Sequence, residues 1–251
     1  MGLVLLRLWL VAGVAAQAGA TDGGVKLAEL EARLDALHAR RDDPAALAEA
    51  RRLADAGVAA APGDYAVLWR AARERFTESD LPTRSDDARS RLGKEAYDLA
   101  ERAIAANPNA VEGQYWAALS IGSYAQGMGV LRALANGIEG KFTRPLERAT
   151  ALDIRYDHGS IPVVWAAYYL ELPWPKRDRA KAAAELERAL QINPANLRAR
   201  LYQARLASDE GHPERARALL AAIASARVGA YDPPEERRVK IEAAKMAATL
   251  H

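Results

Sequence analysis

Apolar side chains recur at steps of three and four residues along almost the whole chain, which is the spacing of one face of an α-helix. Leu27, Leu30, Leu34 and Leu37 give the first clear example. Runs in which apolar and polar residues alternate strictly, as in half-buried β-strands, do not occur. The pattern therefore predicts an all-α protein.

Proline, glycine and short polar clusters divide this pattern into separate helices. Asp42-Asp43-Pro44 and Ser85-Asp86-Asp87 have the residue types that start helices, because their side chains accept hydrogen bonds from free backbone N–H groups. The clearest predicted helices span 27–37, 44–60, 65–75, 85–107, 163–170, 177–192, 197–208 and 213–226, with a last one from 233 onward.

Four segments are expected to be less regular. Residues 77–84 are expected to form a loop, because a proline and a polar cluster interrupt the period. Asn109 and Glu112 match a capping box at a helix start. Five glycines lie within 121–141, which predicts two short helical pieces with a bend. Residues 156–162 are expected to be an irregular link.

One sequence pattern occurs twice, as AERAIAANPNA at 100–110 and as LERALQINPAN at 186–196. A weaker copy, LERATALDIRY, lies at 146–156. In each clean copy a helix with small residues on its packing face stops at Asn-Pro, and a second helix is expected to return. Such units are typical of tetratricopeptide-like helical hairpins, which stack into an α-α superhelix.

The spacing of these units is longer than usual. The expected ends of the first helices, at Pro62, Pro108, Ile154 and Pro194, are 46, 46 and 40 residues apart. The standard tetratricopeptide period is about 34 residues. We therefore expect elongated hairpins with extra residues between their helices.

The amino-acid composition excludes several kinds of functional site. Roughly a fifth of the chain is alanine, which favours helices that pack closely. The chain has no cysteine, which excludes disulfides, thiolate metal sites, cysteine nucleophiles and lipid attachment through an N-terminal cysteine. Its four histidines lie far apart in the sequence. No cofactor and no metal are expected.

The N-terminus has the features of an export signal. Arg7 precedes a short apolar run at 8–16, and Ala-x-Ala cleavage patterns follow at 16–18 and 18–20. We expect cleavage after Ala20, with cleavage after Ala18 and an uncleaved anchor as alternatives. The prediction is a signal peptide at 1–20 and a single helical-repeat domain at 21–251, with its best-defined repeats at about 88–226. The mature protein is expected to be periplasmic or secreted, without a stable membrane span.

Net charge gives no reason to expect nucleic acid as a partner. The chain carries a formal charge of +2, and loss of Arg7 with the signal would leave +1. This value also gives no reason to expect binding to an anionic membrane surface.

Motifs for catalysis are incomplete. Gly140-Lys141 lacks the remaining residues of a phosphate-binding loop, and Gly127-Met128-Gly129 lacks the third glycine and the preceding strand of a dinucleotide site. Glu78-Ser79 is the dipeptide that lytic transglycosylases use, and a cell-wall hydrolase remains an alternative on that basis. The chain is expected not to be an enzyme.

Aromatic residues concentrate between Tyr115 and Trp174. Trp116 and Trp165 occupy comparable places in successive units and are expected to be buried. The others either pack in the core or line a groove for a partner or an apolar ligand. The candidates for partner or ligand binding, with two basic residues that border the segment, are Tyr115, Tyr124, Lys141, Arg144, Tyr168, Tyr169 and Trp174.

The middle of the chain resembles the T-component of tripartite ATP-independent periplasmic (TRAP) transporters. The resemblance lies in YWAA at 115–118, RPLERATALDIRYDHGS at 144–160, AAYYLELPWPKRDRAKA at 166–182 and ERALQINPANL at 187–197. It implies a non-enzymatic, all-helical periplasmic protein that associates with a substrate-binding subunit and forms a homo-oligomer with an apolar channel. The family's lipid-attached start would need a cysteine, which this chain lacks.

The same region is similar to helical proteins of the regulator-of-microtubule-dynamics type, and the export signal argues against that assignment. The sequence thus predicts a TRAP T-component-like accessory protein that binds a partner subunit and an apolar or amphipathic ligand. A homo-oligomer is the assembly that the resemblance implies. The alternative is a periplasmic tetratricopeptide-repeat adaptor for protein–protein interaction.

Overall fold

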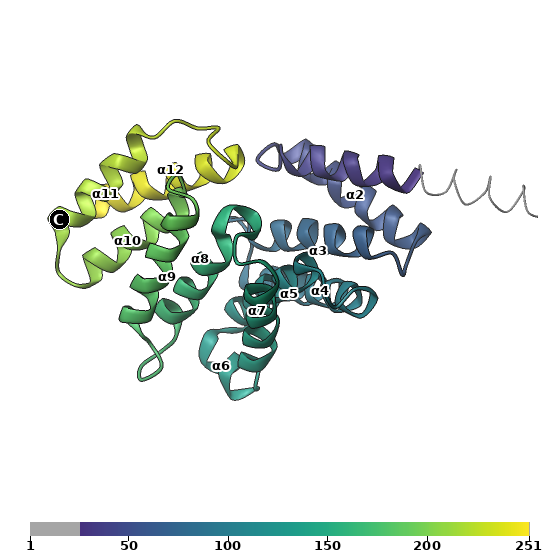
Figure 1. Ribbon diagram of the computed structural model, residues 1–251, viewed down its shortest axis with the longest axis horizontal. Helices are drawn as coiled ribbons and strands as arrows, with labels where there is room; N and C mark the ends of the chain where they lie inside the picture. The colour runs from purple at the N-terminus through teal and green to yellow at the C-terminus, as the bar shows by residue number, and fades with distance from the viewer. Residues whose placement is uncertain (1–25, 251) are drawn as a thin grey trace, which may run out of the picture.

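The computed structural model describes residues 26–250 and places most of them in α-helices, with no strand in that range (Figure 1). This confirms the predicted all-α class. A first helix covers 26–38. It is followed by α2 (Pro44–Ala60), α3 (Tyr65–Ser79), α4 (Asp86–Ala106), α5 (Val111–Met128), α6 (Val130–Ala135), α7 (Glu139–Asp153), α8 (Tyr156–Glu171), α9 (Arg179–Ile192), α10 (Leu197–Asp209), α11 (Pro213–Ser225) and α12 (Pro233–Thr249).

Neighbouring helices pack in sequential order, as expected for stacked hairpins. The helices from the first to α7 form one side of the molecule and α8 to α12 the other (Figure 1). The chain curves so far that the start of α12 lies beside the turn after the first helix (Figure 1). The predicted signal peptide at 1–20 lies outside the described residues.

Side-chain caps fix several helix starts where the sequence predicts them. Asp43, Ser85 and Asn196 each accept a hydrogen bond from a backbone N–H in the first turn of α2, α4 and α10. Each cap satisfies one of the donors that the helix itself leaves free. No described helix is both long enough and apolar enough to cross a lipid bilayer.

The three largest clusters of buried apolar side chains follow one another along the chain. The first is built from α3 to α7 and the start of α8, up to Ile161. The second joins α8, α9 and α10, from Val163 to Ala199. The third joins α10, α11 and α12, from Leu197 to Ala243. Helix α8 contributes to both of the first two clusters and so connects the two sides of the molecule.

Helix α5 differs from the expected pair of short pieces within 121–141. It continues through Gly122 and Gly127 to Met128. A methyl group on Gly127 would lie 2.5 Å from backbone atoms of Asp86 and Ser90, so glycine here allows α5 to approach α4 closely. A methyl group on Gly93 of α4 would lie 2.6 Å from the backbone nitrogen of Tyr124. Gly129, with a φ of 92°, then ends α5. The chain does bend in this segment, at Gly129 and again at residues 136–138.

Two other local predictions are wrong. Residues 77–79, expected in a loop, are the last turn of α3, where the Ser79 hydroxyl bonds the Ser123 hydroxyl at 2.8 Å. The capping box at α5 does not form, and Ala110 occupies the cap position. Asn109 instead accepts a hydrogen bond from Arg148, and Glu112 accepts one from the Tyr65 hydroxyl.

The irregular link expected at 156–162 is shorter than predicted. Asp157, His158 and Gly159 have left-handed backbone angles, with φ values of 49°, 57° and 80°. Pro162 belongs to the first turn of the regular helix that follows, where its missing N–H is tolerated. The link therefore consists of a tight three-residue turn at the start of α8.

Candidate functional site

A cleft of about 440 Å³ lies between the two sides of the superhelix. Its walls come from the end of the first helix, α3, α5, α6, α7, α8, α10 and α12. Eight aromatic side chains line it: Phe76, Tyr115, Trp116, Phe142, Tyr156, Tyr168, Tyr202 and Tyr231. A concave, largely apolar cleft with a few placed polar groups is the usual form of a binding site.

One wall of the cleft is aromatic and aliphatic. Tyr115 packs edge-on against Trp116, with ring centroids 5.1 Å apart. Phe142 of α7 stacks on Tyr168 of α8 at the same centroid distance. The Tyr168 hydroxyl donates a hydrogen bond to Glu139, so this ring is fixed at its polar end as well. These contacts hold the aromatic wall in place.

Helix α8 presents one face to the cleft along most of its length. Its lining residues after the left-handed turn are Ser160, Val163, Val164, Ala167, Tyr168 and Glu171. These positions follow the three- and four-residue spacing of a single helical face. The middle of this face is apolar, and carboxylates lie near its two ends, at Asp157 and Glu171.

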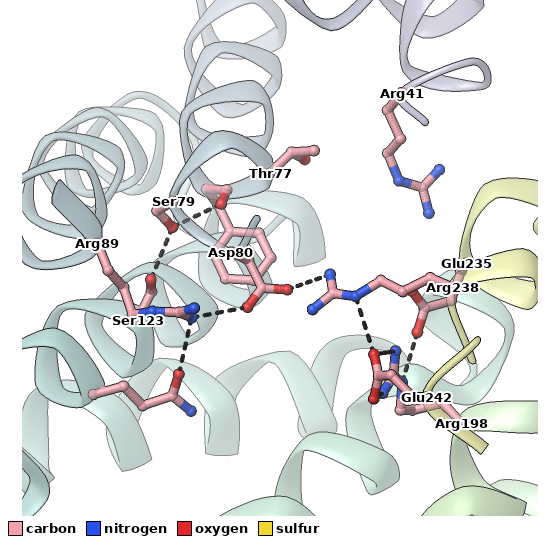
Figure 2. Close-up of polar contacts among 12 residues, drawn as sticks. Arg41, Thr77, Ser79, Asp80, Arg89, Ser123, Arg198, Glu235, Arg238 and Glu242 are labelled. Atoms are coloured by element: carbon pink, nitrogen blue, oxygen red, sulfur yellow. Dashed lines mark hydrogen bonds and ion pairs between the residues drawn. The ribbon is translucent and has the colours of Figure 1, made fainter. Parts of the chain in front are cut away.

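Another part of the cleft lining is a network of charged side chains from the end of α3, from α10 and from α12 (Figure 2). Asp80 accepts hydrogen bonds from Arg89 at 3.2 Å and from Arg238 at 2.5 Å. Arg238 also donates to Glu242 at 3.2 Å. Arg198 then donates to Glu242 (Figure 2). The network crosses from α3 to α12 and continues to α10.

Arg198 lies at the centre of this network. It donates to Glu235 at 2.7 Å and to both oxygens of Glu242, at 2.6 and 3.0 Å. Burial lowers the pKa of Arg198, but the two carboxylates outweigh burial and raise it. Burial alone would raise the pKa of Glu242, but the surrounding arginines, first of all Arg198, lower it overall. Both side chains therefore remain charged at neutral pH.

Two further ion pairs join α12 to the N-terminal end of the molecule. Arg41, which follows the first helix, pairs with Asp232 at 2.5 Å, and Arg237 pairs with Asp42 at 2.6 Å. We call these two pairs, together with Arg238–Asp80, the closing ion pairs. They join segments that are far apart in the sequence and so hold the two ends of the superhelix together around the cleft.

Asp157 belongs to the cleft through its unusual backbone. The left-handed turn places its carboxylate 3.1 Å from the Tyr115 hydroxyl, which donates to it. Burial, followed by the charge of Asp157, raises the pKa of Tyr115. Left-handed backbone costs free energy in any residue except glycine and often marks functional positions.

Glu171 lies at the other end of the α8 face. Its Oε2 accepts a hydrogen bond from Gln126 of α5 at 3.0 Å. The surrounding protein raises the pKa of Glu171 by desolvation, which the Gln126 hydrogen bond only partly opposes. Its side chain still contacts solvent through the open cleft.

The structure brings two of the seven sequence-predicted binding residues to this cleft, Tyr115 and Tyr168. Tyr124 packs half-buried against the first core cluster. Tyr169 stacks on Trp165, with centroids 5.9 Å apart, and belongs to the second cluster. Trp174 is 89% exposed on a loop outside the cleft.

The two basic candidates do not reach the cleft either. Lys141 and Arg144 lie on the exposed side of α7. The Lys141 ammonium lies 6.0 Å from the centre of the Tyr97 ring, which is a contact with the neighbouring helix α4. Of the two tryptophans expected to be buried, Trp116 is buried and lines the cleft, whereas Trp165 is only half-buried.

Several lining residues were missed by the sequence analysis. The three- and four-residue spacing from Ser160 to Glu171 is visible in the sequence and could have indicated the lining face of α8. Arg41, Arg198 and Arg238 could not have been found in this way, because their partners lie far away along the chain, 158 residues away in the case of Arg238.

Glu78 and Ser79, the transglycosylase-like dipeptide, have structural roles. Glu78 accepts hydrogen bonds from Arg51 at 2.8 Å and from Arg84 at 3.0 Å. Ser79 is fully buried. Neither residue lines the cleft. Within residues 26–250, no cluster of three or more histidines and carboxylates is arranged to hold a metal ion.

Comparison with known proteins agrees with this architecture. A thermophilic tetratricopeptide-repeat protein from Thermus thermophilus has a similar crystal structure, with a TM-score of 0.65 and 18% sequence identity. The match covers 88% of this chain and 100% of that chain. The protein is thus an all-α, tetratricopeptide-like helical-repeat protein.

The family is shown by the sequence. The model of the family described as "Regulator of microtubule dynamics protein 1-3" matches residues 31–251, so the chain belongs to that family. No curated protein sequence matches the chain. The family match supports the second of the two resemblances seen in the sequence, and these comparisons give no support to the TRAP T-component assignment that the export signal favoured.

Proposed function

We propose that this protein is a non-catalytic adaptor that binds a partner protein, and that the cleft holds an extended segment of that partner. The observation that carries the proposal is the cleft itself, which an aromatic wall and an ion-pair network line together inside a tetratricopeptide-like superhelix. Superhelices of this class commonly offer their concave surface to partners. Membership in the regulator-of-microtubule-dynamics family is consistent with a binding role.

A photo-crosslinking experiment tests this proposal. A photoreactive phenylalanine analogue replaces Tyr168 in the cleft, and a matched protein carries it at Trp174, which is exposed outside the cleft. The Tyr168 protein is expected to crosslink to one recurring peptide segment of one partner, identified by mass spectrometry. Equal crosslinking from both positions, or many unrelated segments from Tyr168, would contradict a specific protein-binding cleft.

The absence of catalysis is part of the same proposal. Glu78 is held by two arginines outside the cleft, so it is not placed to donate a proton to a substrate there. Glu78→Gln is expected to leave partner binding unchanged. Peptidoglycan cleavage that is present in the natural protein and lost in this variant would overturn the proposal.

The cellular location of the protein and the identity of its partner are also proposals. Arg7, the apolar run at 8–16 and the two Ala-x-Ala patterns support export to the periplasm or beyond. A substrate-binding subunit of a TRAP transporter is the partner that the first resemblance implies. Cell fractionation with N-terminal sequencing tests the former, and recovery of that subunit with the crosslinked protein tests the latter.

A further inference from the structure

We propose that the bound partner segment is an extended peptide with a basic side chain at each end of an apolar stretch. The inference rests on the proposed function and specifies the chemistry of the segment. It is carried by the carboxylates of the cleft that form no ion pair, by the length of the α8 face, and by the apolar wall between those carboxylates.

The cleft has an excess of negative charge. Six carboxylates and four guanidinium groups line it. Arg41, Arg198 and Arg238 pair with lining carboxylates, and Arg73 pairs with Asp35 and Glu74. Burial lowers the pKa of the remaining basic side chain, His38, which favours its neutral form. The balance of the lining therefore favours a cationic occupant.

The excess charge lies on two particular carboxylates. Within the described part of the chain, neither Asp157 nor Glu171 forms an ion pair, and each receives a hydrogen bond from an uncharged group, the Tyr115 hydroxyl or the Gln126 amide. Arg41 lies close enough to Asp157 for that carboxylate to raise the Arg41 pKa, but the Arg41 guanidinium is bound to Asp232. Arg205 and Arg89 also act on Glu171, but they are bound to Glu242 and Asp80. A lysine or arginine of a partner can pair with each carboxylate.

The distance between these carboxylates favours a polymer over a small ion. Ser160 and Glu171 are eleven residues apart on α8, about 16 Å at 1.5 Å per residue, and Asp157 lies beyond Ser160. An extended peptide spans about 20 Å with about six residues, at 3.3 Å or slightly more per residue. Two basic residues about six positions apart can therefore reach both carboxylates.

The wall between the carboxylates suits apolar side chains. Val163, Val164 and Ala167 form the middle of the α8 face, with Tyr168 beside them. Apolar side chains of a bound peptide can pack against this stretch and so remove apolar surface from water. Aromatic rings near a bound ammonium or guanidinium add cation–π attraction.

Peptide pools test the inference directly on the full chain. Fluorescent pools of about ten residues have randomised apolar positions between two fixed residues about six positions apart. The fixed pair is Lys and Lys, Lys and Gln, Gln and Gln, or Glu and Glu. Retention by the protein is expected to fall in that order, with about tenfold between the first and third pools at low salt.

Two substitutions test whether the preference for lysine-containing peptides arises in the cleft. Asp157→Asn keeps a residue that tolerates the left-handed backbone, and Glu171→Gln keeps the size of the side chain. The double variant is expected to lose the preference for lysine, about tenfold, while binding the Gln–Gln pool as the natural protein does. Glu214→Gln, at an exposed carboxylate outside the cleft, is the control and is expected to keep the preference.

The outcomes separate this inference from the proposed function. Equal retention of the Lys and Gln pools, with crosslinking still confined to Tyr168, overturns the basic-peptide inference and leaves the adaptor function standing. A lysine preference that survives in the double variant also overturns it. Native mass spectrometry of the protein from its own cells that finds a lipid in the cleft, with no pool retained, overturns both.

Discussion

Arg238 donates a hydrogen bond of 2.5 Å to Asp80, and this contact joins α12 to α3 although the two residues are 158 positions apart. Asp80 also accepts from Arg89 of α4, so one carboxylate connects three helices. The other closing ion pairs, Arg41–Asp232 and Arg237–Asp42, act between the same two sides of the molecule. The two sides of the molecule are therefore joined around the cleft by charge pairs that are partly exposed to solvent.

Salt is expected to loosen these closing ion pairs. Between about 0.01 M and about 1 M salt the Debye length falls from about 30 to about 3 Å, which screens exposed pairs more than apolar packing. Amide hydrogen exchange at the start of α12 is expected to rise with salt, while α4 and α9 stay unchanged. Asp80→Asn is expected to give the same rise already at low salt. Exchange in α12 that is independent of both salt and this substitution would contradict the expectation.

Gly93→Ala is expected to destabilise the protein by about 2 kcal/mol, because the added methyl group would overpack the contact between α4 and α5. That methyl group would lie 2.6 Å from the Tyr124 nitrogen and 3.0 Å from the Ser120 carbonyl oxygen, and backbone atoms cannot rotate away. Urea unfolding followed by circular dichroism measures the loss. Gly63→Ala is the matched control, since nothing lies within 4 Å of its added methyl group, and its effect is expected to stay within about 0.5 kcal/mol.

Glu236→Gln is expected to cost about 2 kcal/mol of unfolding free energy. Its fully buried carboxylate accepts hydrogen bonds from the backbone N–H groups of Gly229, Ala230 and Tyr231, and so orders the turn before α12. A glutamine amide would turn two N–H donors toward this cluster of donors. The measurement is chemical denaturation. Glu214→Gln, at an exposed site, is expected to be neutral, and equal stabilities for both variants would refute the role assigned to Glu236.

Glu242 is expected to make stability depend on pH in the acid range. Its folded-state pKa is lowered because the arginines, first of all Arg198, outweigh the effect of burial. A lowered carboxyl pKa contributes stability above the unfolded-state pKa, near 4.5, and that contribution is lost as pH falls through the folded-state pKa. Glu242→Gln is therefore expected to cost about 2 kcal/mol at pH 6, and less below about pH 4.

Denaturant unfolding of both proteins at several pH values measures this difference. A gap between the natural protein and Glu242→Gln that stays constant from pH 6 to pH 3 would show that Glu242 is not held by the arginine network. Arg205 also donates to Glu242, at 3.0 Å and from the more exposed edge of the network, and contributes to the lowered pKa of Glu242.

Local features of the fold could be predicted from the sequence wherever a short stretch of chain decides them. The starts of α2, α4 and α12 follow from Asp43, Ser85 and Asp232-Pro233, and the Asn-Pro stops mark the ends of α4 and α9. The glycines of α5 misled the analysis, because glycine weakens an isolated helix but permits close helix packing in a folded one.

The site was less predictable because it depends on contacts between distant segments. Tyr115 and Tyr168 were found because aromatic side chains are rare in this chain and concentrate in its middle. Tyr124 and Tyr169 are only a few residues away from them, yet they face neighbouring helices instead of the cleft. Nothing near Arg238 in the sequence indicates that Asp80 is its partner. The export signal and the extent of the domain at 21–251 stay predictions.

The separation of the apolar clusters has a consequence for how the molecule loses its structure. No buried residue of the cluster in α10, α11 and α12 belongs to the cluster that α3, α4 and α5 form. Stacked helical repeats of this kind melt in parts, since each unit is stabilised mainly by its neighbours. A calorimetric melting curve is therefore expected to be broader than that of a single cooperative unit.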